Sequence, residues 1–382
     1  MKILHVIESL RRNAGGAAEI VPVMAEEQCI RGADVTIITL SSDDYSRTAL
    51  HAKDQGVKIL TYPRSRILPG IIGFSYRYVK DFDSLLANAD VVHVHGLWQF
   101  FGWWASIRAI RSRKRLIVQP HGSLEPEALK ISKWKKRIVG SVIERPLLRR
   151  ANCVLATSES ELEHIVSYGV KDDRVRAISL GLNIRPYVTS VPSDKLLSRM
   201  GIDVSKKRVL YFSRITPIKG LDLLAKAWHE LQEIHDEWQL VITGPDDRGY
   251  TEKMKELYHN MLPRGSYVFT GPVYGTEKFS LLKSVQAFVL PTRSENFSLA
   301  VAEAMASEVP VVCTKGAPWG IVETTGAGYW VDVSAHSIGE GLKKILSLDD
   351  AERREIGLNG RRCVERYFSW DSIINKMLEL YA

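Results

Sequence analysis

Two acidic side chains in one short segment offer the clearest chemistry in this chain. Glu295 and Glu303 stand eight residues apart in the segment ENFSLAVAE. Arg214 and Lys219 occur earlier, in SRITPIKG, between a strand-like run and an expected helix. Cations of this kind neutralise a diphosphate, and carboxylates accept hydrogen bonds from vicinal hydroxyls. The combination predicts a binding site for a phosphorylated sugar carrier.

Each of these motifs also has a simpler interpretation. Arg214 and Lys219 could be solvated loop cations, which is the usual state of such residues. Glu303, however, is flanked by small apolar residues, which indicates a helix packed on most sides, where a carboxylate needs partners. Eight helical residues span roughly 12 Å, so Glu295 and Glu303 would bind separate ends of one ligand. Backbone N–H groups of residues 297–299, at the expected helix start, suit a phosphate.

The elements that position these groups alternate along the chain. Short β-branched runs predict strands at 2–6, 35–40, 57–60, 91–95, 116–119, 153–157, 209–213, 239–243, 267–270, 287–290, 309–313 and 329–331. Helical patterns occur at 17–31, 74–88, 98–112, 131–150, 220–235, 251–261, 275–284 and 299–307. This alternation indicates parallel sheets covered on both faces, and its repetition indicates two doubly wound α/β domains.

The boundary between the domains is expected in the turn-rich segment 183–207. We therefore predict an N-terminal, acceptor-binding domain of residues 1–185 and a C-terminal, donor-binding domain of residues 186–368. Ligands of open α/β sheets bind at the carboxyl ends of the strands, so two facing sheets would bind between the domains.

Size and composition agree with a two-domain globular protein. The chain has 382 residues, more than one hydrophobic core usually serves, and it is 45% hydrophobic and 25% charged. Its four cysteines are scattered without a Cys-x-x-Cys pair, which favours a reducing compartment over a disulfide framework or a zinc cluster. An acid follows the start too early for a secretory signal, and no run is long enough to span a membrane. We expect a cytoplasmic protein.

The net charge of +8 is concentrated in one region, since residues 108–150 hold 13 basic and 3 acidic side chains. This region lacks a recognisable nucleic-acid motif, so an anionic membrane leaflet fits better than nucleic acid. Within it, Trp134, Ile138 and Val142 are interleaved with lysines and arginines, a pattern typical of a helix on the inner leaflet. A core-facing helix with a solvated basic face would show the same pattern.

Gly15 and Gly16 follow the first strand and precede an expected helix, where glycine permits close backbone approach to an anion. A tight loop would also require glycine. The Gly-x-Gly-x-x-Gly fingerprint is absent from the sequence, which counts against a nicotinamide or flavin enzyme.

Four segments together resemble a known family. The Ser-Arg-x4-Lys-Gly and Glu-x7-Glu segments, the early Gly-Gly pair and Pro120-His121-Gly122 are similar to the family 4 retaining glycosyltransferases of polysaccharide biosynthesis, which have the GT-B fold. The resemblance covers nearly the whole chain. It implies two Rossmann-like domains that face each other across a cleft, with a final helix at 369–382 that crosses back to the first domain.

The resemblance also implies a role for each motif residue. Arg214 and Lys219 would bind a diphosphate, Glu303 the ribose and Glu295 the donor sugar, while His121 would approach the reacting carbon. The residues expected to bind the donor are Gly16, Arg214, Lys219, Val273, Glu295, Asn296, Phe297, Ser298, Leu299 and Glu303. Those expected to act in catalysis are His121, Arg214, Lys219 and Glu295.

His93 and His95 share one face of a predicted strand, which suggests a metal pair. No third ligand stands at a suitable spacing, and the resembling family needs no metal for catalysis. We therefore predict no metal and no cofactor apart from the nucleotide-diphosphate sugar. His95, Gly96 and Trp98 are instead expected at the carboxyl end of the strand, facing the acceptor.

The predicted reaction is hexosyl transfer from a nucleotide-diphosphate sugar to a hydroxyl of a glycan or lipid-linked glycan, with retained configuration. Family frequency puts UDP-glucose first as donor and GDP-mannose next. No carboxylate suits the role of nucleophile, so a same-face route is preferred to double displacement. The alternatives are a nucleotide-sugar 2-epimerase and a non-catalytic binding protein with the GT-B fold.

Overall fold

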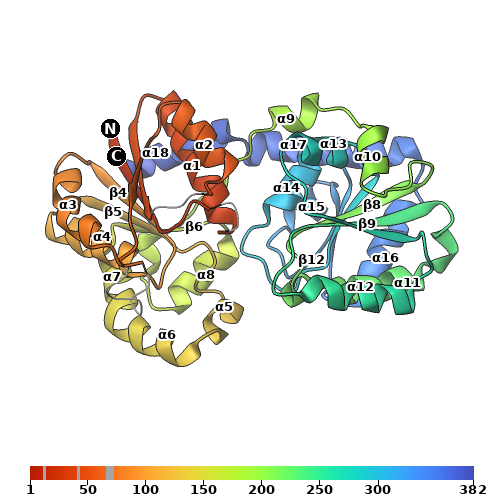
Figure 1. The fold of residues 1–382 in the computed structure, drawn as a ribbon, viewed down its shortest axis with the longest axis horizontal. Helices are drawn as coiled ribbons and strands as arrows, with labels where there is room; N and C mark the ends of the chain where they lie inside the picture. Colours follow the sequence, from red (N-terminus) through yellow and green to blue (C-terminus); the bar gives the residue numbers. More distant parts are fainter. Residues whose placement is uncertain (12–13, 41–43, 66–72) are drawn as a thin grey trace. The chain divides into compact units, whose positions relative to one another are not determined.

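The computed structural model describes residues 1–11, 14–40, 44–65 and 73–382. The chain forms two compact units, one of Met1–Gly181 with Trp370–Ala382 and the other of Leu182–Ser369 (Figure 1). The boundary predicted near residue 185 falls just inside the second unit. Each unit contains one parallel sheet with helices on both faces, so the predicted α/β class with two Rossmann-like domains is confirmed.

The first unit is built on a parallel sheet which, within the described residues, has seven strands in the order β3-β2-β1-β4-β5-β6-β7. The strands are β1 Lys2–Ile7, β2 Asp34–Leu40, β3 Lys58–Tyr62, β4 Val91–His95, β5 Arg115–Gln119, β6 Cys153–Ala156 and β7 Val175–Ala177. The helices are α1 Gly16–Ile30, α2 Arg47–Asp54, α3 Tyr76–Ala87, α4 Phe100–Arg111, α5 Pro126–Lys130, α6 Lys133–Val139, α7 Arg145–Arg150, α8 Glu159–Ser167 and α18 Trp370–Tyr381.

Strands β1 and β4 occupy the middle of this sheet, where the order of the strands reverses. All five residues of β4 are buried, because helices cover both faces of the sheet. Helix α1 packs against α18, so the last helix of the chain belongs to the first unit and the two termini lie close together (Figure 1). Helix α3 packs against α4, and α4 contacts β1, β4 and β5.

The second unit has a parallel sheet with the strand order β10-β9-β8-β11-β12-β13. The strands are β8 Lys207–Phe212, β9 Trp238–Thr243, β10 Tyr267–Gly271, β11 Ala287–Leu290, β12 Val311–Thr314 and β13 Gly328–Val331. The helices are α9 Arg185–Thr189, α10 Asp194–Arg199, α11 Leu221–Glu230, α12 Tyr250–Met261, α13 Thr276–Lys283, α14 Leu299–Ala306, α15 Ile321–Thr324, α16 Ala335–Leu346 and α17 Asp350–Tyr367.

One face of this second sheet carries α11, α12 and α16, and the other carries α14 with α17 packed over it (Figure 1). The core between the sheet and the first group contains Trp228, Trp238 and Tyr258, all nearly inaccessible. Strand β12 begins at Val311, two residues later than predicted. Pro310 precedes it, and proline has no N–H to donate to the ladder.

The helical pattern predicted over 131–150 corresponds to helix from Lys133 to Arg150, interrupted by a π-helical turn that was not predicted. The segment contains α6, a π-helical turn at Gly140–Glu144 and then α7. Pro146 stands in the first turn of α7, where its missing N–H does not break a helical bond. At Gly140 a Cβ would lie 2.3 Å from the hydroxyl of Tyr168, so a larger residue here would displace that side chain. The turn directs the Glu144 carboxylate inward, where it accepts hydrogen bonds from the Trp98 backbone and the Trp103 indole.

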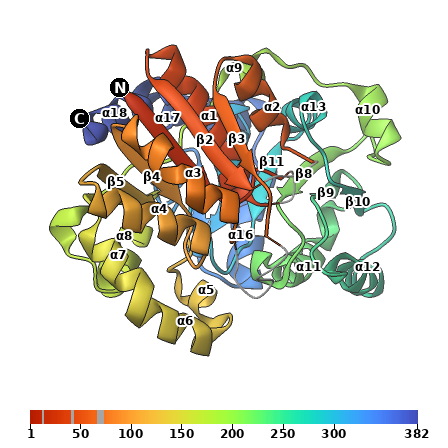
Figure 2. The same cartoon turned by 60° about the vertical axis from the view of Figure 1, so that its left-hand side comes forward.

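Helices α5 and α6 lie at the periphery of the first unit (Figure 2). No residue of α6 is buried, so the alternative of a core-facing helix does not apply to residues 133–139. The described part of the chain contains no helix with the length and apolar character to cross a membrane.

Candidate active site

Lys219 and Glu295 form an ion pair at the carboxyl edge of the second sheet. Lys219 ends a 3-10 turn that follows β8, and Glu295 lies in the loop after β11, the strand that pairs with β8. The two loops are joined because Arg293 N–H donates to the carbonyl of Ile218 at 2.8 Å. Only 8% of the Lys219 side chain and 14% of the Glu295 side chain are exposed. Two of the predicted site residues are thus brought together as a largely buried pair.

Close backbone packing holds these two loops in place. At Gly220, directly after Lys219, a Cβ would lie 2.0 Å from the carbonyl oxygen of Pro291, and the backbone has a φ of 72°. At Gly316, whose carbonyl accepts from the Glu295 N–H at 2.8 Å, a Cβ would lie 2.3 Å from the Thr292 carbonyl. Any other residue at Gly220 would be strained as well as crowded. The position of the ion pair therefore depends on glycine.

Arg214 lies just after β8 and is exposed to solvent. Its carbonyl accepts from the buried Tyr211 hydroxyl at 2.9 Å, which fixes the backbone while the guanidinium remains accessible. A second arginine, Arg293, forms a bidentate pair with Asp222 on α11 at 2.7 and 2.8 Å. Arg293 therefore anchors its loop, and Arg214 is the more accessible cation at this edge.

Glu303 lies on α14 and is 8% exposed. Its Oε1 accepts from the Tyr187 hydroxyl at 2.8 Å and from the Lys278 ammonium at 2.7 Å. Burial raises the pKa of Tyr187 well above its usual value, and the nearby Glu303 adds to the shift. The sequence predicted that Glu303 needs partners but did not identify these two. They stand 116 and 25 residues away on α9 and α13, at no informative spacing.

Helix α14 begins at Leu299, as expected, and Ser298 precedes it with a φ of 69°. The Phe297 carbonyl accepts a short hydrogen bond from the Trp319 indole, so this loop is fixed on one side by the core. Asn296 is partly exposed beside it. Val273, one of the residues expected to bind the donor, is 3% exposed in the loop after β10.

In the first unit, the structure brings His95 and His121 together. His95 ends β4, His121 follows β5, and the His95 Nδ1 lies 3.0 Å from the His121 Nε2. Burial lowers the pKa of His121 to about 4 and that of His95 well below its usual value. Both rings are therefore neutral at pH 7. Gly96 donates to the Gln119 carbonyl at 2.9 Å, and Trp98 has a φ of 68°.

A buried carboxylate positions the loop that carries His121. One oxygen of Glu161 accepts from the Gly122 N–H at 2.6 Å, and the other accepts from the N–H and hydroxyl of Thr157. His121 itself has a φ of 53°, which is uncommon outside glycine and needs this support. Sequence reasoning missed Glu161, which is one of three glutamates in α8 and has no distinguishing pattern around it.

Gly16 is the first residue of α1, and it is exposed. A Cβ at Gly15 or Gly16 would meet no atom of the described structure within 4 Å. Gly15 needs glycine for its φ of 96°, whereas Gly16 leaves the start of α1 open to a ligand.

The sequence showed no third ligand at a suitable spacing from His93 and His95, but the fold supplies one. His5 of β1 lies beside them, because β1 pairs with β4 in a register that sets His5 opposite His93. One ring nitrogen of each residue lies within 4.8 Å of the others.

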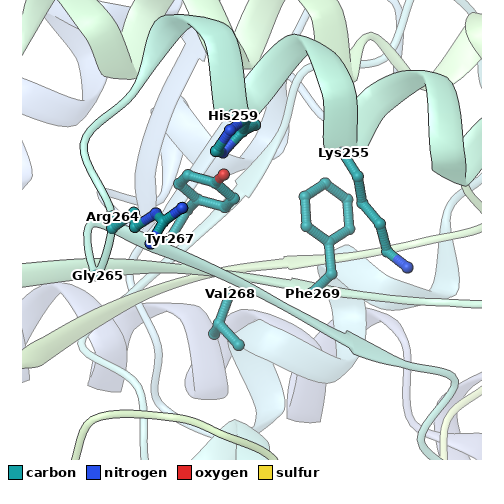
Figure 3. Close-up of a pocket in the computed structure, with 7 residues that line it drawn as sticks. All are labelled: Lys255, His259, Arg264, Gly265, Tyr267, Val268 and Phe269. Carbon is teal, nitrogen blue, oxygen red and sulfur yellow. The ribbon is translucent and has the colours of Figure 1, made fainter.

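An open hollow of about 450 Å³ lies elsewhere, along the edge strand β10 and helix α12 (Figure 3). Its lining includes Lys255, His259, Tyr267 and Phe269, and Figure 3 shows His259 over the ring of Tyr267. None of the predicted donor-binding residues lines it. The hollow is therefore separate from the Lys219–Glu295 pair.

Two family models match the chain. The model described as Glycosyl transferase 4-like domain matches residues 15–181, and the model described as Glycosyl transferases group 1 matches residues 193–362.

Among curated relatives, the D-inositol 3-phosphate glycosyltransferase of Xylanimonas cellulosilytica is 25% identical, with 97% of this chain and 92% of the relative covered. The GDP-mannose:cellobiosyl-diphosphopolyprenol alpha-mannosyltransferase of Xanthomonas campestris is 24% identical over 100% of this chain and 96% of the relative. Among solved structures, Anabaena HepE in complex with UDP and glucose has a TM-score of 0.78 and 17% identity, covering 99% of this chain and 98% of that one.

The two Rossmann-like units therefore have the GT-B fold, and the loops at the carboxyl edge of the second sheet carry the cations and carboxylates described above. The chain belongs to the family 4 glycosyltransferases. It is a hexosyltransferase that uses a nucleotide-sugar donor.

Proposed function

We propose that the enzyme transfers a hexosyl unit from a nucleotide-diphosphate sugar to a hydroxyl of a glycan or lipid-linked glycan, with retained anomeric configuration. The observation that carries this proposal is the Lys219–Glu295 pair, which stands at the carboxyl ends of the neighbouring strands β8 and β11. In open α/β sheets this edge is where ligands bind.

The cations supply the main catalytic term in this proposal. As the glycosidic bond breaks, negative charge grows on the departing diphosphate, and fixed positive groups stabilise it. The Lys219 ammonium has three donors, so it can keep its bond to Glu295 and still bind a phosphate oxygen. Arg214, accessible nearby, adds a planar fork of donors. Because side chains provide this charge, we expect turnover without added divalent cation.

The carboxylates orient the donor. Glu295 accepts hydrogen bonds from the sugar hydroxyls, with backbone groups of residues 296–299 beside the distal phosphate. Glu303 accepts hydrogen bonds from the ribose hydroxyls. Both contacts to Glu303 in the described structure use Oε1, so the ribose would engage Oε2. Val273 contributes apolar surface to the base.

His121 takes part as a neutral ring in this scheme. Since burial lowers its pKa to about 4, it exchanges hydrogen bonds with a donor-sugar hydroxyl without adding a charge. His95, Gly96 and Trp98 are proposed to face the acceptor from the carboxyl end of β4. Gly16 offers its backbone N–H to the diphosphate at the start of α1.

The donor is proposed to be UDP-glucose. The names of several relatives, including the Xanthomonas mannosyltransferase, favour GDP-mannose as the second candidate. The acceptor of that relative is a diphosphopolyprenol-linked sugar, which supports a lipid-linked glycan acceptor for this enzyme.

A lipid-linked acceptor would bring the enzyme to a membrane, and α6 has the surface for it. Ile131, Trp134, Ile138 and Val142 are between 61% and 77% exposed. Lysines and Arg137 surround them, and Trp134 and Ile138 share one face of the helix at a spacing of four residues. An exposed apolar stripe within a basic segment is typical of a helix that lies on an anionic leaflet.

The function is tested by a donor panel. UDP-glucose or GDP-mannose is expected to raise the thermal midpoint, since a ligand of the folded state stabilises it. With a lipid-linked acceptor, the product should carry the anomeric configuration of the donor, read from its NMR coupling constant. Lys219→Ala should lose turnover, whereas the exposed Lys226→Ala on α11 should keep it.

A product with inverted anomeric configuration would contradict the proposed retention. Donor isomerised without any acceptor would support the 2-epimerase instead, and no response to any nucleotide sugar would support the non-catalytic alternative.

A further inference from the structure

The buried face of the first sheet holds a histidine cluster that the proposed reaction does not use as a whole. His5 of β1 lies opposite His93 of β4, and strand alternation puts His95 on the same face as His93. Their exposed fractions are 0%, 0% and 4%. The ring centroids of His93 and His95 are 4.1 Å apart, and His5 lies 5.1 to 5.2 Å from both.

Each of the three rings has an outer hydrogen-bond partner on one nitrogen. His5 Nε2 lies 2.7 Å from Gln28 Oε1, and His93 Nδ1 lies 2.6 Å from the Tyr381 hydroxyl. His95 Nδ1 lies 3.0 Å from His121 Nε2. Gln28 Oε1 can only accept, so His5 Nε2 carries the proton and His5 Nδ1 the lone pair, whereas the Tyr381 hydroxyl and His121 Nε2 can each donate or accept.

The opposite nitrogens are His5 Nδ1, His93 Nε2 and His95 Nε2. His5 Nδ1 and His95 Nε2 are 2.8 Å apart and share one hydrogen bond. In the part of the chain that the structure describes, His93 Nε2 is buried without a hydrogen-bond partner. Buried polar atoms in this state are rare and need an explanation.

We propose that His5, His93 and His95 bind a zinc ion within the first unit. One ring nitrogen from each residue already lies within 4.8 Å of the others, and ligands at the Zn–N distance of about 2.0–2.1 Å in a tetrahedron are about 3.4 Å apart. A small adjustment of the rings, in which His5 and His95 separate slightly and His93 moves closer, therefore completes the ligand set. The sequence predicted no metal site, because only His93 and His95 were recognised as ligands and His5 was not.

The chemistry of the donors favours zinc. All three rings are buried, and burial favours the neutral form of imidazole that binds a metal. Neutral imidazole suits Zn²⁺, and three protein ligands leave the fourth position to a solvent molecule. Gln28, Tyr381 and His121 form the outer shell that orients the rings.

Bound zinc would link distant parts of the chain. It would fix β1 to β4 and, through Tyr381, anchor α18 on the sheet. Through His95 it would also hold the ring of His121. The ion's role is thus structural and goes beyond the proposed transfer reaction.

The test uses untagged full-length enzyme, because an affinity tag of histidines binds the same metals. After incubation with Zn²⁺ and gel filtration, about one zinc per chain is expected by elemental analysis. Co²⁺ in its place should give the visible absorption of a tetrahedral site. His5→Gln and His93→Gln should each reduce the zinc content at least tenfold, whereas the exposed His336→Gln in the second unit should leave it unchanged.

Tyr381→Phe keeps the three ligands and removes one outer partner, so zinc affinity should fall about 10- to 100-fold. This variant and the wild-type zinc content give a result even if a histidine variant fails to fold. A folded wild-type chain that retains less than a tenth of an equivalent of zinc would overturn the proposal. So would a cobalt spectrum unaltered in His93→Gln. The zinc content and the cobalt spectrum do not depend on turnover. A failure of the proposed function would therefore not change either measurement.

Discussion

Lys219 and Glu295 keep two charges in a largely buried position. Removing both ions from water is expensive, and a well-packed apolar pair of similar volume is often as stable or more so. Stability alone therefore gives little reason for an ion pair here. Binding a diphosphate and its sugar requires one cation and one carboxylate at this edge of the sheet. This requirement explains the ion pair better than stability does.

The two roles can be separated with three variants. Lys219→Met leaves the Glu295 carboxylate buried without its partner, and breaking such a pair costs about 3–5 kcal/mol of folding stability. Turnover should fall at least 100-fold, because a fixed charge on the leaving group is lost. The double variant Lys219→Met/Glu295→Leu should recover most of the stability in urea unfolding, yet remain inactive. Recovery of turnover along with stability would show that the pair is only structural.

The sequence identified Lys219 and Glu295 from residue type and their places after strands, and the fold brings them together. It did not identify Tyr187, Lys278 or Glu161. These side chains act through contacts between residues distant in sequence, and each stands in a segment whose own pattern is ordinary. Glu161, one of three glutamates in α8, becomes informative only when Gly122 and Thr157 are seen to converge on it.

At the scale of elements, the buried strands were the most predictable part of the chain. The predicted bounds of β4 and β11 agree with the structure, because each is a short run that is rich in β-branched or apolar residues and is buried throughout. The π-helical turn between α6 and α7 was missed. It depends on Gly140 meeting Tyr168 and on Glu144 finding indole and backbone donors, none of which is local to the helix. Helices α16 and α17 were also missed.

Helix α6 is expected to bind vesicles that contain anionic lipid and to leave neutral vesicles unbound. The basic side chains near the surface each contribute about 1 kcal/mol with such lipids, and Trp134 and Ile138 insert at the headgroup level. Reversing Lys133, Lys135 and Arg137 to Glu should reduce sedimentation with anionic vesicles at low salt at least tenfold. Lys136 is left in place because it donates to the Ala128 carbonyl at 2.6 Å.

A matched control carries the same change in charge elsewhere. Lys226→Glu, Lys253→Glu and Lys343→Glu are exposed positions on helices of the second unit, so the triple variant should sediment as the wild type does. Trp134→Ser should weaken binding without altering the charge. If the α6 variant and the control variant sediment equally with anionic vesicles, α6 is not the membrane contact.

At the scale of the whole molecule, contacts between distant segments decide what the sequence could not. His5 and His93 are separated by the whole of α1, β2, β3 and α3, and only the strand order puts β1 beside β4. Gln28 and Tyr381 are 353 residues apart and yet hydrogen-bonded. The alternation of strands and helices predicted the class of fold, but it carries no information on which strands are neighbours.

The same cluster predicts how stability depends on pH. Burial lowers the pKa values of His5, His93, His95 and His121, so the folded chain keeps them neutral while the unfolded chain binds protons near pH 6.5. Stability from this source is complete above about pH 6.5 and is lost as the pH falls toward 4. Each histidine contributes a slope of about 1.4 kcal/mol per pH unit in that window. Glu144 acts in the opposite direction, because burial raises its pKa.

Urea unfolding at pH 7, 6 and 5, with a chelator present, measures this slope. His5→Gln removes one titrating ring and should make the loss of stability between pH 6 and 5 smaller by about 1.4 kcal/mol. His336→Gln, at an exposed site, should follow the wild type. Comparing slopes within this set cancels the contribution of every other acid and base. If His5→Gln and the wild type lose stability in parallel, His5 is protonated or solvated in the folded chain, and the buried neutral cluster does not exist in solution.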